Sequence, residues 1–485
     1  MNPLTAPTGP TVSTVSTVST ALRPLLRLTA LAAATVLAAC GGGGGGGSTP
    51  APAPAPALPP ADLSVAAALV ATGYPDLMGN PRPQAIVGDT TVQVRFTAGN
   101  AGPTAVTGAL FRLDAVAGFT PSAIACANAT GGASCPANLT LQGAAGGVPL
   151  DLPSGAGMAF TVTGTANQTG SIAPRATMVV PSTVSDANTA NNGAQLAITV
   201  NPIAPSTLVT SVPAPTYAAG SEQLAAFNYL NGIRGRCGFG LLKQDTRLDQ
   251  AAGDHANYLA VNFAQLGAIG HVQTPGLPGF TGITVGDRTI ARGYEGISTE
   301  GVIFGVPTAS LQRFVAALLQ TAYHSTAALG SPTDVGFGRQ TLGASFVVVV
   351  YGTERNTVGQ QMAGDAVALA PCDGERDWRR VHAPENPNPM PGVPLGTYGA
   401  ALVAKVREGQ LLSVDEWTLI GPGGAPVSTT LRRFGNDPNN NMAVNRAVLI
   451  PNVVLAPNTT YNVVLRGKNS GIPFERRYSF TTGAD

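Results

Sequence analysis

Three of the four histidines of this 485-residue chain, His255, His271 and His324, fall within residues 224–351. An imidazole changes charge near neutral pH, so it can act as a general acid or base, and it also binds Zn²⁺. No H-E-x-x-H sequence occurs, and the spacing of these histidines fits no compact metal motif. A site built from them must therefore be assembled by the fold from distant segments.

The same stretch offers little for nucleophilic catalysis. Ser298 and Ser325 lie near the histidines in sequence, but neither has the glycine context of a nucleophile elbow. We expect Cys237 to be tied up in a disulfide, which leaves no thiolate. A catalytic triad is therefore not expected.

Helices and one buried strand should position the histidines. Two apolar faces recur at helical spacing, and Asp245 precedes the second of them as an N-cap. A third helix should follow Pro307, capped by Thr308. Residues 346–351 form a continuous β-branched run that suits a strand covered on both faces. Helices around such a strand predict a layered α/β domain. The helical faces comprise Leu224, Phe227, Leu230 and Arg234; Leu248, Ala252, His255 and Leu259; and Leu311, Phe314, Val315 and Leu318, with His324 near the third helix end.

Short motifs spread over residues 222–355 resemble the CAP superfamily of cysteine-rich secretory and pathogenesis-related proteins in its bacterial form. Each motif is weak alone, but their order and spacing match across the whole stretch. They are Leu230-Asn231-Gly232-Ile233-Arg234, Ala251-Ala252-Gly253-Asp254-His255-Ala256, Gly270-His271, Phe280-Thr281-Gly282, Asp287-Arg288, Arg292-Gly293-Tyr294, Glu300, Ala322-Tyr323-His324 and Gly336-Phe337-Gly338.

This resemblance implies an α-β-α sandwich over residues 218–375, with a surface cleft lined by His271, Glu300 and His324 and with His255 as a lesser candidate. Two imidazoles and a carboxylate can hold a divalent cation with one open position, or act without metal as an acid/base pair. Two departures stand out. Glu300 lacks the asparagine that follows it in the family, and the late histidine of the eukaryotic members is absent.

Structural explanations compete with each candidate. His255 lies on an apolar helical stripe, which favours a buried, hydrogen-bonded histidine. His324 near a helix C-terminus would gain from the helix dipole when protonated. His271, among glycines and prolines, could be ordinary loop surface, although we favour the site interpretation for His271, Glu300 and His324. His382 lies outside the domain and is expected to be solvated.

The flanking regions are predicted to be β-modules. Period-two strands separated by turns fill residues 62–201, and short strands recur over residues 398–485. Asn100-Ala101-Gly102-Pro103 and the Asp/Asn cluster of residues 186–192 resemble bacterial Ig-like domains, as do residues 455–461 and 479–483. The Asp/Asn cluster could bind calcium, but Asx turns explain it as well and are preferred. The whole predicts a multidomain α+β protein: a CAP-type sandwich between two all-β Ig-like sandwiches, with a linker at residues 202–217 and a Pro-rich hinge at residues 376–397.

The first 61 residues predict export and anchoring. Arginines, an apolar run and Leu37-Ala38-Ala39-Cys40 resemble a bacterial lipoprotein signal, with residues 1–39 removed and Cys40 lipidated. A tether of glycine and then Pro/Ala, residues 40–61, follows. We expect a lipid-anchored protein of the cell envelope, at the outer membrane or cell surface if the cell is Gram-negative.

Four cysteines remain, an even number in an oxidising compartment. We expect two local pairs, Cys126 with Cys135 and Cys237 with Cys372, in preference to crossed pairings. The second would close a long loop around the central domain.

Composition and site together leave two function classes. Net charge is +1 and no basic block occurs, so nucleic acid is not an expected partner. The first class is an envelope lipoprotein whose cleft binds a lipid, glycan or protein ligand, with or without a divalent cation, zinc or calcium. The second is a metal-dependent, peptidase-like hydrolase using His271, Glu300 and His324. A third alternative is that the whole chain serves as an adhesive spacer with no specific ligand site.

Overall fold

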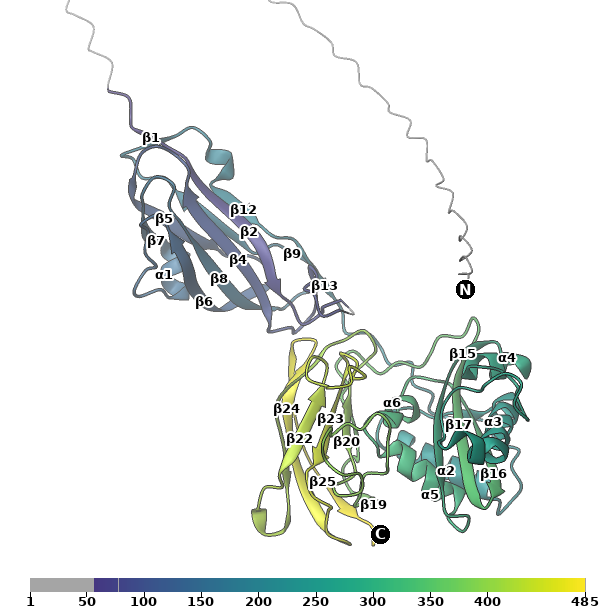
Figure 1. The fold of residues 1–485 in the computed structure, drawn as a ribbon. Helices are drawn as coiled ribbons and strands as arrows, with labels where there is room; N and C mark the ends of the chain where they lie inside the picture. Colours follow the sequence, from purple (N-terminus) through teal and green to yellow (C-terminus); the bar gives the residue numbers. More distant parts are fainter. Residues whose placement is uncertain (1–55, 77, 485) are drawn as a thin grey trace, which may run out of the picture. The chain divides into compact units, whose positions relative to one another are not determined.

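The computed structural model describes residues 56–76 and 78–484. The predicted signal peptide, Cys40 and most of the predicted tether lie outside these residues. The described part is mostly β, with seven sheets and six α-helices (Figure 1). We describe it as an N-terminal module (residues 60–201), a central domain (residues 222–354) and a C-terminal module (residues 368–482).

Two four-stranded sheets pack face to face in the N-terminal module. Its elements are β1 (Pro60–Ala61), β2 (Leu63–Ala71), β3 (Gln84–Ile86), β4 (Val92–Asn100), β5 (Val106–Asp114), β6 (Phe119–Thr130), α1 (Leu141–Gly146), β7 (Val148–Leu152), β8 (Gly157–Ala166), β9 (Gly170–Ile172), β10 (Arg175–Val179), β11 (Ser185–Asp186), η1 (Thr189–Asn191), β12 (Gly193–Gln195) and β13 (Ile198–Asn201). The sheet orders are β2-β4-β8-β6 and β12-β10-β5-β7, and a smaller sheet has the order β3-β13-β9. Phe111 and Phe160 stack between the two large sheets with ring centroids 4.1 Å apart.

The Asp/Asn cluster of this module forms turns. One carboxylate oxygen of Asp186 accepts the backbone N–H of Asn188 at 2.9 Å, which is an Asx turn. The other accepts the backbone N–H of Leu63 at 3.0 Å. Both oxygens are therefore engaged by backbone, and the preferred interpretation as a turn is confirmed.

The central domain is built on one four-stranded sheet. Its strands are β14 (Lys243–Gln244), β15 (Gly296–Gly305), β16 (Asp334–Leu342) and β17 (Ala344–Glu354), in the order β14-β16-β17-β15. Strand β17 contains the predicted buried run, and residues 346–351 are all buried. Successive side chains of a strand point to opposite faces, so this run contributes to two cores.

Helices cover both faces of this sheet. They are α2 (Glu222–Arg236), α3 (Thr246–Leu266), α4 (Val285–Ala291), α5 (Leu311–Leu319) and α6 (His324–Ala328). Val347 and Val349 share a core with Phe227 of α2 and Leu318 of α5. Phe346, Val348 and Val350 share another with Leu248, Ala252 and Leu259 of α3.

The helix ends agree in part with the sequence analysis. Asp245 caps α3 as predicted, because its carboxylate accepts the backbone N–H of Arg247. The prediction of Thr308 as the cap of the third helix is wrong, since Ser310 caps α5 and accepts the N–H of Arg313 at 3.3 Å. That helix ends at Leu319, and His324 opens the separate helix α6. His324 therefore lies at a helix N-terminus, and the helix-dipole explanation based on a C-terminus fails.

Two glycines let α3 lie directly on β16. A Cβ at Gly338 would meet the backbone of Ala252 at 2.1 Å, and one at Gly336 would meet the backbone N of Asp249 at 2.2 Å. Any larger residue would push the helix off the sheet. This close packing gives the Gly336-Phe337-Gly338 motif a structural reason.

The C-terminal module consists of two four-stranded sheets. Its elements are β18 (Ala368–Ala370), β19 (Glu375–Trp378), β20 (Leu402–Lys405), β21 (Leu412–Ile420), η2 (Pro422–Gly424), β22 (Thr429–Arg433), β23 (Arg446–Pro451), β24 (Thr460–Asn469) and β25 (Ile472–Thr482). The sheet orders are β18-β20-β23-β22 and β19-β25-β24-β21. Strands β18 and β19 precede residue 398, where the module was predicted to begin. The module thus takes in the end of the predicted central domain and the start of the predicted hinge.

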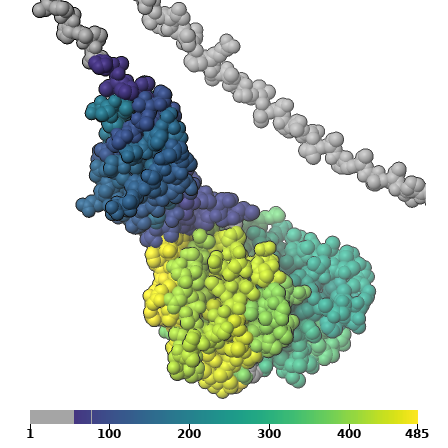
Figure 2. All heavy atoms as spheres, turned by 60° about the vertical axis from the view of Figure 1, so that its left-hand side comes forward, coloured from purple at the N-terminus to yellow at the C-terminus, as the bar shows by residue number. Residues whose placement is uncertain are grey.

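The central domain and the C-terminal module share one hydrophobic core. Phe227 and Leu318 of the central domain belong to the same buried cluster as Leu402, Trp417 and Leu449 of the module. The two segments, green and yellow, lie side by side in Figures 1 and 2. A core of this kind holds them as one packed body, unlike two modules joined by a hinge.

Both predicted disulfides are confirmed. Cys126 pairs with Cys135 inside the N-terminal module, with Cα atoms 5.7 Å apart. Cys237, the C-cap of α2, pairs with Cys372, which follows β18. The second disulfide therefore links the central domain to the C-terminal module. Among the described helices, none has the length and apolarity needed to cross a membrane.

Candidate functional site

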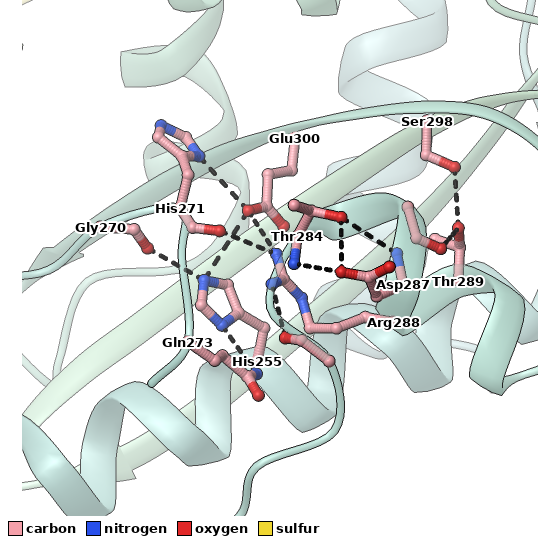
Figure 3. Close-up of polar contacts among 12 residues, drawn as sticks. His255, Gly270, His271, Gln273, Thr284, Asp287, Arg288, Thr289, Ser298 and Glu300 are labelled. Atoms are coloured by element: carbon pink, nitrogen blue, oxygen red, sulfur yellow. Dashed lines mark hydrogen bonds and ion pairs between the residues drawn. The ribbon is translucent and has the colours of Figure 1, made fainter. Parts of the chain in front are cut away.

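Glu300 of β15 is the buried centre of the site (Figure 3). Its Oε1 atom accepts a hydrogen bond from Nη2 of Arg288 at 2.6 Å, and the Arg288 side chain is also buried. Arg288 projects from α4, which a capping box between Thr284 and Asp287 fixes at its N-terminus. The cap thus sets the start of a short helix whose arginine neutralises the buried carboxylate.

His271 lies in the loop after α3 and reaches Glu300 from the solvent side. Its Nδ1 atom is 3.3 Å from Oε1 of Glu300, and its side chain is 50% exposed. Arg288 also donates to the backbone carbonyl of His271 at 3.3 Å. One arginine therefore positions both the loop and the carboxylate.

His255 is buried on the other side of Glu300 and does not line the cleft. Its Nε2–H donates to the carbonyl of Gly270 at 2.9 Å, and its Nδ1 accepts from Gln273 at 3.1 Å. Burial lowers the pKa of His255 to about 4, against the opposing effect of the Glu300 charge. His255 is thus a neutral core histidine, as its apolar helical stripe predicted, and its candidate place in the cleft is not supported.

His324 forms a second His–Glu pair with a residue that the sequence analysis missed. Its Nδ1 atom is 2.8 Å from Oε1 of Glu385, which is buried. The same carboxylate accepts the backbone N–H of His324 at 2.8 Å and that of Tyr323 at 2.9 Å. Tyr323, the N-cap residue of α6, makes no capping hydrogen bond with its own side chain. Glu385 therefore caps α6 from a segment 61 residues further along the chain.

Glu385 belongs to the predicted hinge, where the sequence offered one hint. His382 and Glu385 are the titratable groups in a run of Pro and Asn residues. The prediction that His382 is solvated is wrong, because it is 1% exposed. Its Nε2 accepts the backbone N–H of Ala322 at 3.0 Å, and its Nδ1–H donates to the carbonyl of Ala383 at 2.7 Å. Burial lowers the pKa of His382, so this histidine is a neutral structural partner of the segment before α6.

Both histidines and Glu300 border one cleft, and Glu385 lies buried behind His324. The rings of His271 and His324 are tilted toward each other with centroids 5.9 Å apart. The cleft has a volume of about 700 Å³ and is lined by His271, Glu300 and His324 together with residues of the C-terminal module. Hydroxyl and amide side chains make up much of its polar wall: Thr299, Thr326, Ser331, Thr353, Thr357, Asn386 and Asn441.

Both glutamates are held as carboxylates. Burial by itself would raise the pKa of Glu300, but the hydrogen bond from His271 and the charge of Arg288 outweigh it and lower the pKa. Burial likewise opposes ionisation of Glu385, and the hydrogen bonds and charge of His324 lower its pKa. A carboxylate with these donors is a stable anion near neutral pH.

His271, Glu300 and His324 are not among the groups whose ligand atoms lie close enough to hold a metal in the residues that the structure describes. Oε1 of Glu300 accepts from Arg288, whereas its Oε2 atom is buried and has no hydrogen-bond partner among these residues. In the part of the chain that the structure describes, the one group of three ligand atoms close enough for a metal is Cys237, Cys372 and Glu375. Its two sulfurs form the disulfide, which leaves no thiolates to bind an ion.

Comparisons with known proteins add little. No family model and no curated protein matches the chain. Among solved structures, an outer surface protein from Borrelia burgdorferi is 18% identical, with a TM-score of 0.23, over 29% of this chain and 97% of its own. A CARDB domain from Pyrococcus furiosus, in complex with di-metal ions, is 17% identical, with a TM-score of 0.19, over 29% of this chain and 89% of its own. A solution structure of the same CARDB domain is 16% identical with a TM-score of 0.19, over 30% of this chain and 97% of its own. At TM-scores this low the likenesses carry no argument.

Proposed function

We propose that the chain is a cell-envelope lipoprotein of the CAP superfamily whose cleft binds a glycan. The sequence motifs support the family, and the helices on both faces of the central sheet suit an α-β-α sandwich. The three residues carried over by resemblance, His271, Glu300 and His324, all line one cleft. Flanking β-modules, Ig-like by their turn motifs, suit a protein that presents this cleft away from a membrane.

The lining of the cleft is the observation that carries the ligand class. Its uncharged hydroxyl and amide side chains can each donate or accept a hydrogen bond, which suits the many hydroxyls of a saccharide. A volume of about 700 Å³ lies in the range typical of small-molecule sites. The exposed imidazole of His271 adds a flat surface for a sugar ring.

Binding fits the site better than hydrolysis. Arg288 pairs with the Glu300 carboxylate, and the Glu385 carboxylate is fully buried behind His324 and does not line the cleft. The metal-dependent alternative would need the ligand atoms of His271, Glu300 and His324 to lie closer together than they do here. We expect no zinc that depends on His271 in calorimetric titration at about pH 7.5. If the wild type binds one zinc tightly per chain and His271→Ala does not, the metal-dependent hydrolase becomes the better proposal.

Anchoring through Cys40 belongs to the same proposal. A lipidated Cys40 followed by a glycine and Pro/Ala tether would hold the described modules at the surface of a membrane. We expect Cys40→Ala to release the protein from the membrane fraction. A variant that pellets like the wild type would argue against the lipid anchor.

The test of the binding function is a screen of the whole chain against immobilised short oligosaccharides, with phospholipid vesicles as the competing ligand class. We expect saccharide binding that His271→Ala and Glu385→Gln each weaken by about tenfold, because the first removes a side chain of the cleft and the second removes the buried carboxylate that orients His324. Glu475→Gln is the matched control, because Glu475 lies in the same module and pairs with exposed Arg466. Binding to vesicles alone, or saccharide binding that neither variant changes, would contradict the glycan proposal.

A further inference from the structure

The cleft contains a buried arginine that has few partners. Arg446 is the first residue of β23; its side chain is 6% exposed and lines the cleft. A guanidinium carries five N–H donors. Among the described residues, the Arg446 guanidinium makes one hydrogen bond, from Nη1 to the carbonyl of Ser325 at a long 3.4 Å, and its Nη2 is 3.9 Å from Oε1 of Glu408. Most of its donors are therefore left for something else.

Two further buried cations surround this arginine. Nζ of Lys405 contacts Glu408 at 3.0 Å and Oγ of Ser331 at 2.9 Å, so it is the closer partner of the carboxylate. Arg234 donates to backbone carbonyls alone, among them those of Gly240 and Ala328, each at 2.7 Å. Burial lowers the pKa of Lys405 to about 7 and that of Arg234 to about 9, with the Arg446 charge adding to both effects.

The balance of charge around Arg446 is positive. Arg234 and Arg446 supply two cations, and Lys405, with its lowered pKa, supplies a third in part. Glu408 is the one carboxylate among the described residues within ion-pair distance of any of them. Buried charge without a counter-charge is costly, and a bound anion would remove that cost. Arg446 is the member of the group whose side chain reaches the cleft wall.

We propose that Arg446 forms a subsite for the carboxylate of an acidic saccharide, a uronic acid unit. The inference rests on the proposed glycan-binding function and narrows its ligand class. The planar guanidinium matches a carboxylate in two parallel hydrogen bonds. Ser331 also lines the cleft; its hydroxyl donates to Glu408 and can still accept a hydrogen bond from a ring hydroxyl. Glu408 also lines the cleft and would repel a phosphate dianion more strongly than a carboxylate, so the monoanion is favoured.

The experiment is calorimetric titration of the whole chain with three probes: trigalacturonic acid, the neutral galactose trisaccharide and galactose 1-phosphate, which carries a phosphate and no carboxylate. We expect the acidic trisaccharide to bind at least about tenfold more tightly than the neutral one, since a hydrogen bond to a charged group contributes about that much. Arg446→Gln should remove the difference, so that the acidic and the neutral trisaccharide bind with similar affinity. Arg466→Gln, an exposed arginine of the same module, is the matched control and should change nothing.

Each outcome supports or overturns one part of the proposal. Equal affinity for the acidic and neutral trisaccharides, or a preference that survives Arg446→Gln, overturns the carboxylate subsite and leaves glycan binding intact. Tighter, Arg446-dependent binding of the phosphate overturns the choice of anion. Failure of both trisaccharides to bind overturns the proposed function together with the subsite. If Arg446→Gln does not fold, the wild type decides: only the affinity for the acidic trisaccharide should fall as salt rises from about 50 to 500 mM.

Discussion

Replacing His255 by glutamine should remove an acid-sensitive element from the central domain. In the folded chain this histidine is fully buried and neutral, with both ring nitrogens hydrogen-bonded. Glutamine offers a donor and an acceptor to the same partners, so the variant should fold with a modest loss of packing. The wild type must expose and protonate His255 when α3 opens in acid, whereas the variant has nothing to protonate there.

The size of the effect follows from two pKa values. The pKa of His255 is about 4 in the folded chain, and the ordinary value is 6.5. The stability that neutral His255 contributes is therefore fully present above pH 6.5 and is lost as the pH falls toward 4. At about pH 5, His255 is almost wholly protonated in the opened state, whereas about one-tenth of it is protonated in the folded state. The difference corresponds to about 2 kcal/mol, or about a 30-fold rise in opening. At about pH 7.5 the same contribution is close to zero.

Hydrogen exchange in α3 measures this opening directly. We expect the ratio of wild-type to His255→Gln opening to rise about 30-fold between about pH 7.5 and pH 5. Acid-sensitive groups that do not contact His255, such as His382, are present in both proteins and cancel from the ratio. A ratio that stays constant would refute the neutral, buried state of His255. If a folded His255→Gln variant loses saccharide binding at about pH 7.5, His255 takes part in ligand binding after all.

Two further predictions concern the scaffold. Gly338→Ala should destabilise the central domain by about 1–3 kcal/mol or more, because the added methyl group would meet the α3 backbone. Gly253→Ala should stabilise it by about 0.5–1 kcal/mol, because Gly253 lies within α3 and the added methyl group would meet open space. Thermal melts of both variants test this, and equal effects would contradict the packing argument. Replacing Cys237 and Cys372 together by alanine should lower stability by about 2–4 kcal/mol and increase hydrogen exchange in α2 and β18 together, since the disulfide closes a long loop between the central domain and the C-terminal module. Unchanged exchange in β18 would show that the shared core alone holds it.

Local patterns predicted local structure well. The β-branched run of residues 346–351 indicated a strand buried on both faces, and Asp245 before an apolar stripe indicated the start of α3. Cysteine number and spacing suggested both disulfides. These signals work because burial, capping and sequence-local pairing leave their marks within a few residues.

The predictions that the structure contradicts failed for a common physical reason: they depend on tertiary contacts that leave no local pattern in the sequence. Thr308 and Ser310 are both good N-cap residues two positions apart, so composition alone could not choose between them. The apolar face of α5 gave no sign that the helix ends at Leu319, and His324 was placed at the wrong end of a helix as a result. The Pro-rich segment looked like a hinge because proline disrupts regular ladders, yet tertiary contacts bury its Glu385 and His382. A partner 61 residues away leaves no local signature.

The unit that makes this cleft is larger than the domain that the family resemblance outlines. Glu385 orients His324 and caps α6, Arg446 lines the cleft, and both lie beyond residue 375. The same boundary cuts the core that Phe227 shares with Leu402, and it separates β18 from its partner strand β20. A fragment ending at residue 375 would therefore expose apolar surface and leave His324 without its carboxylate. The C-terminal module is thus part of the cleft, and specificity could change through that module while the central motifs stay the same.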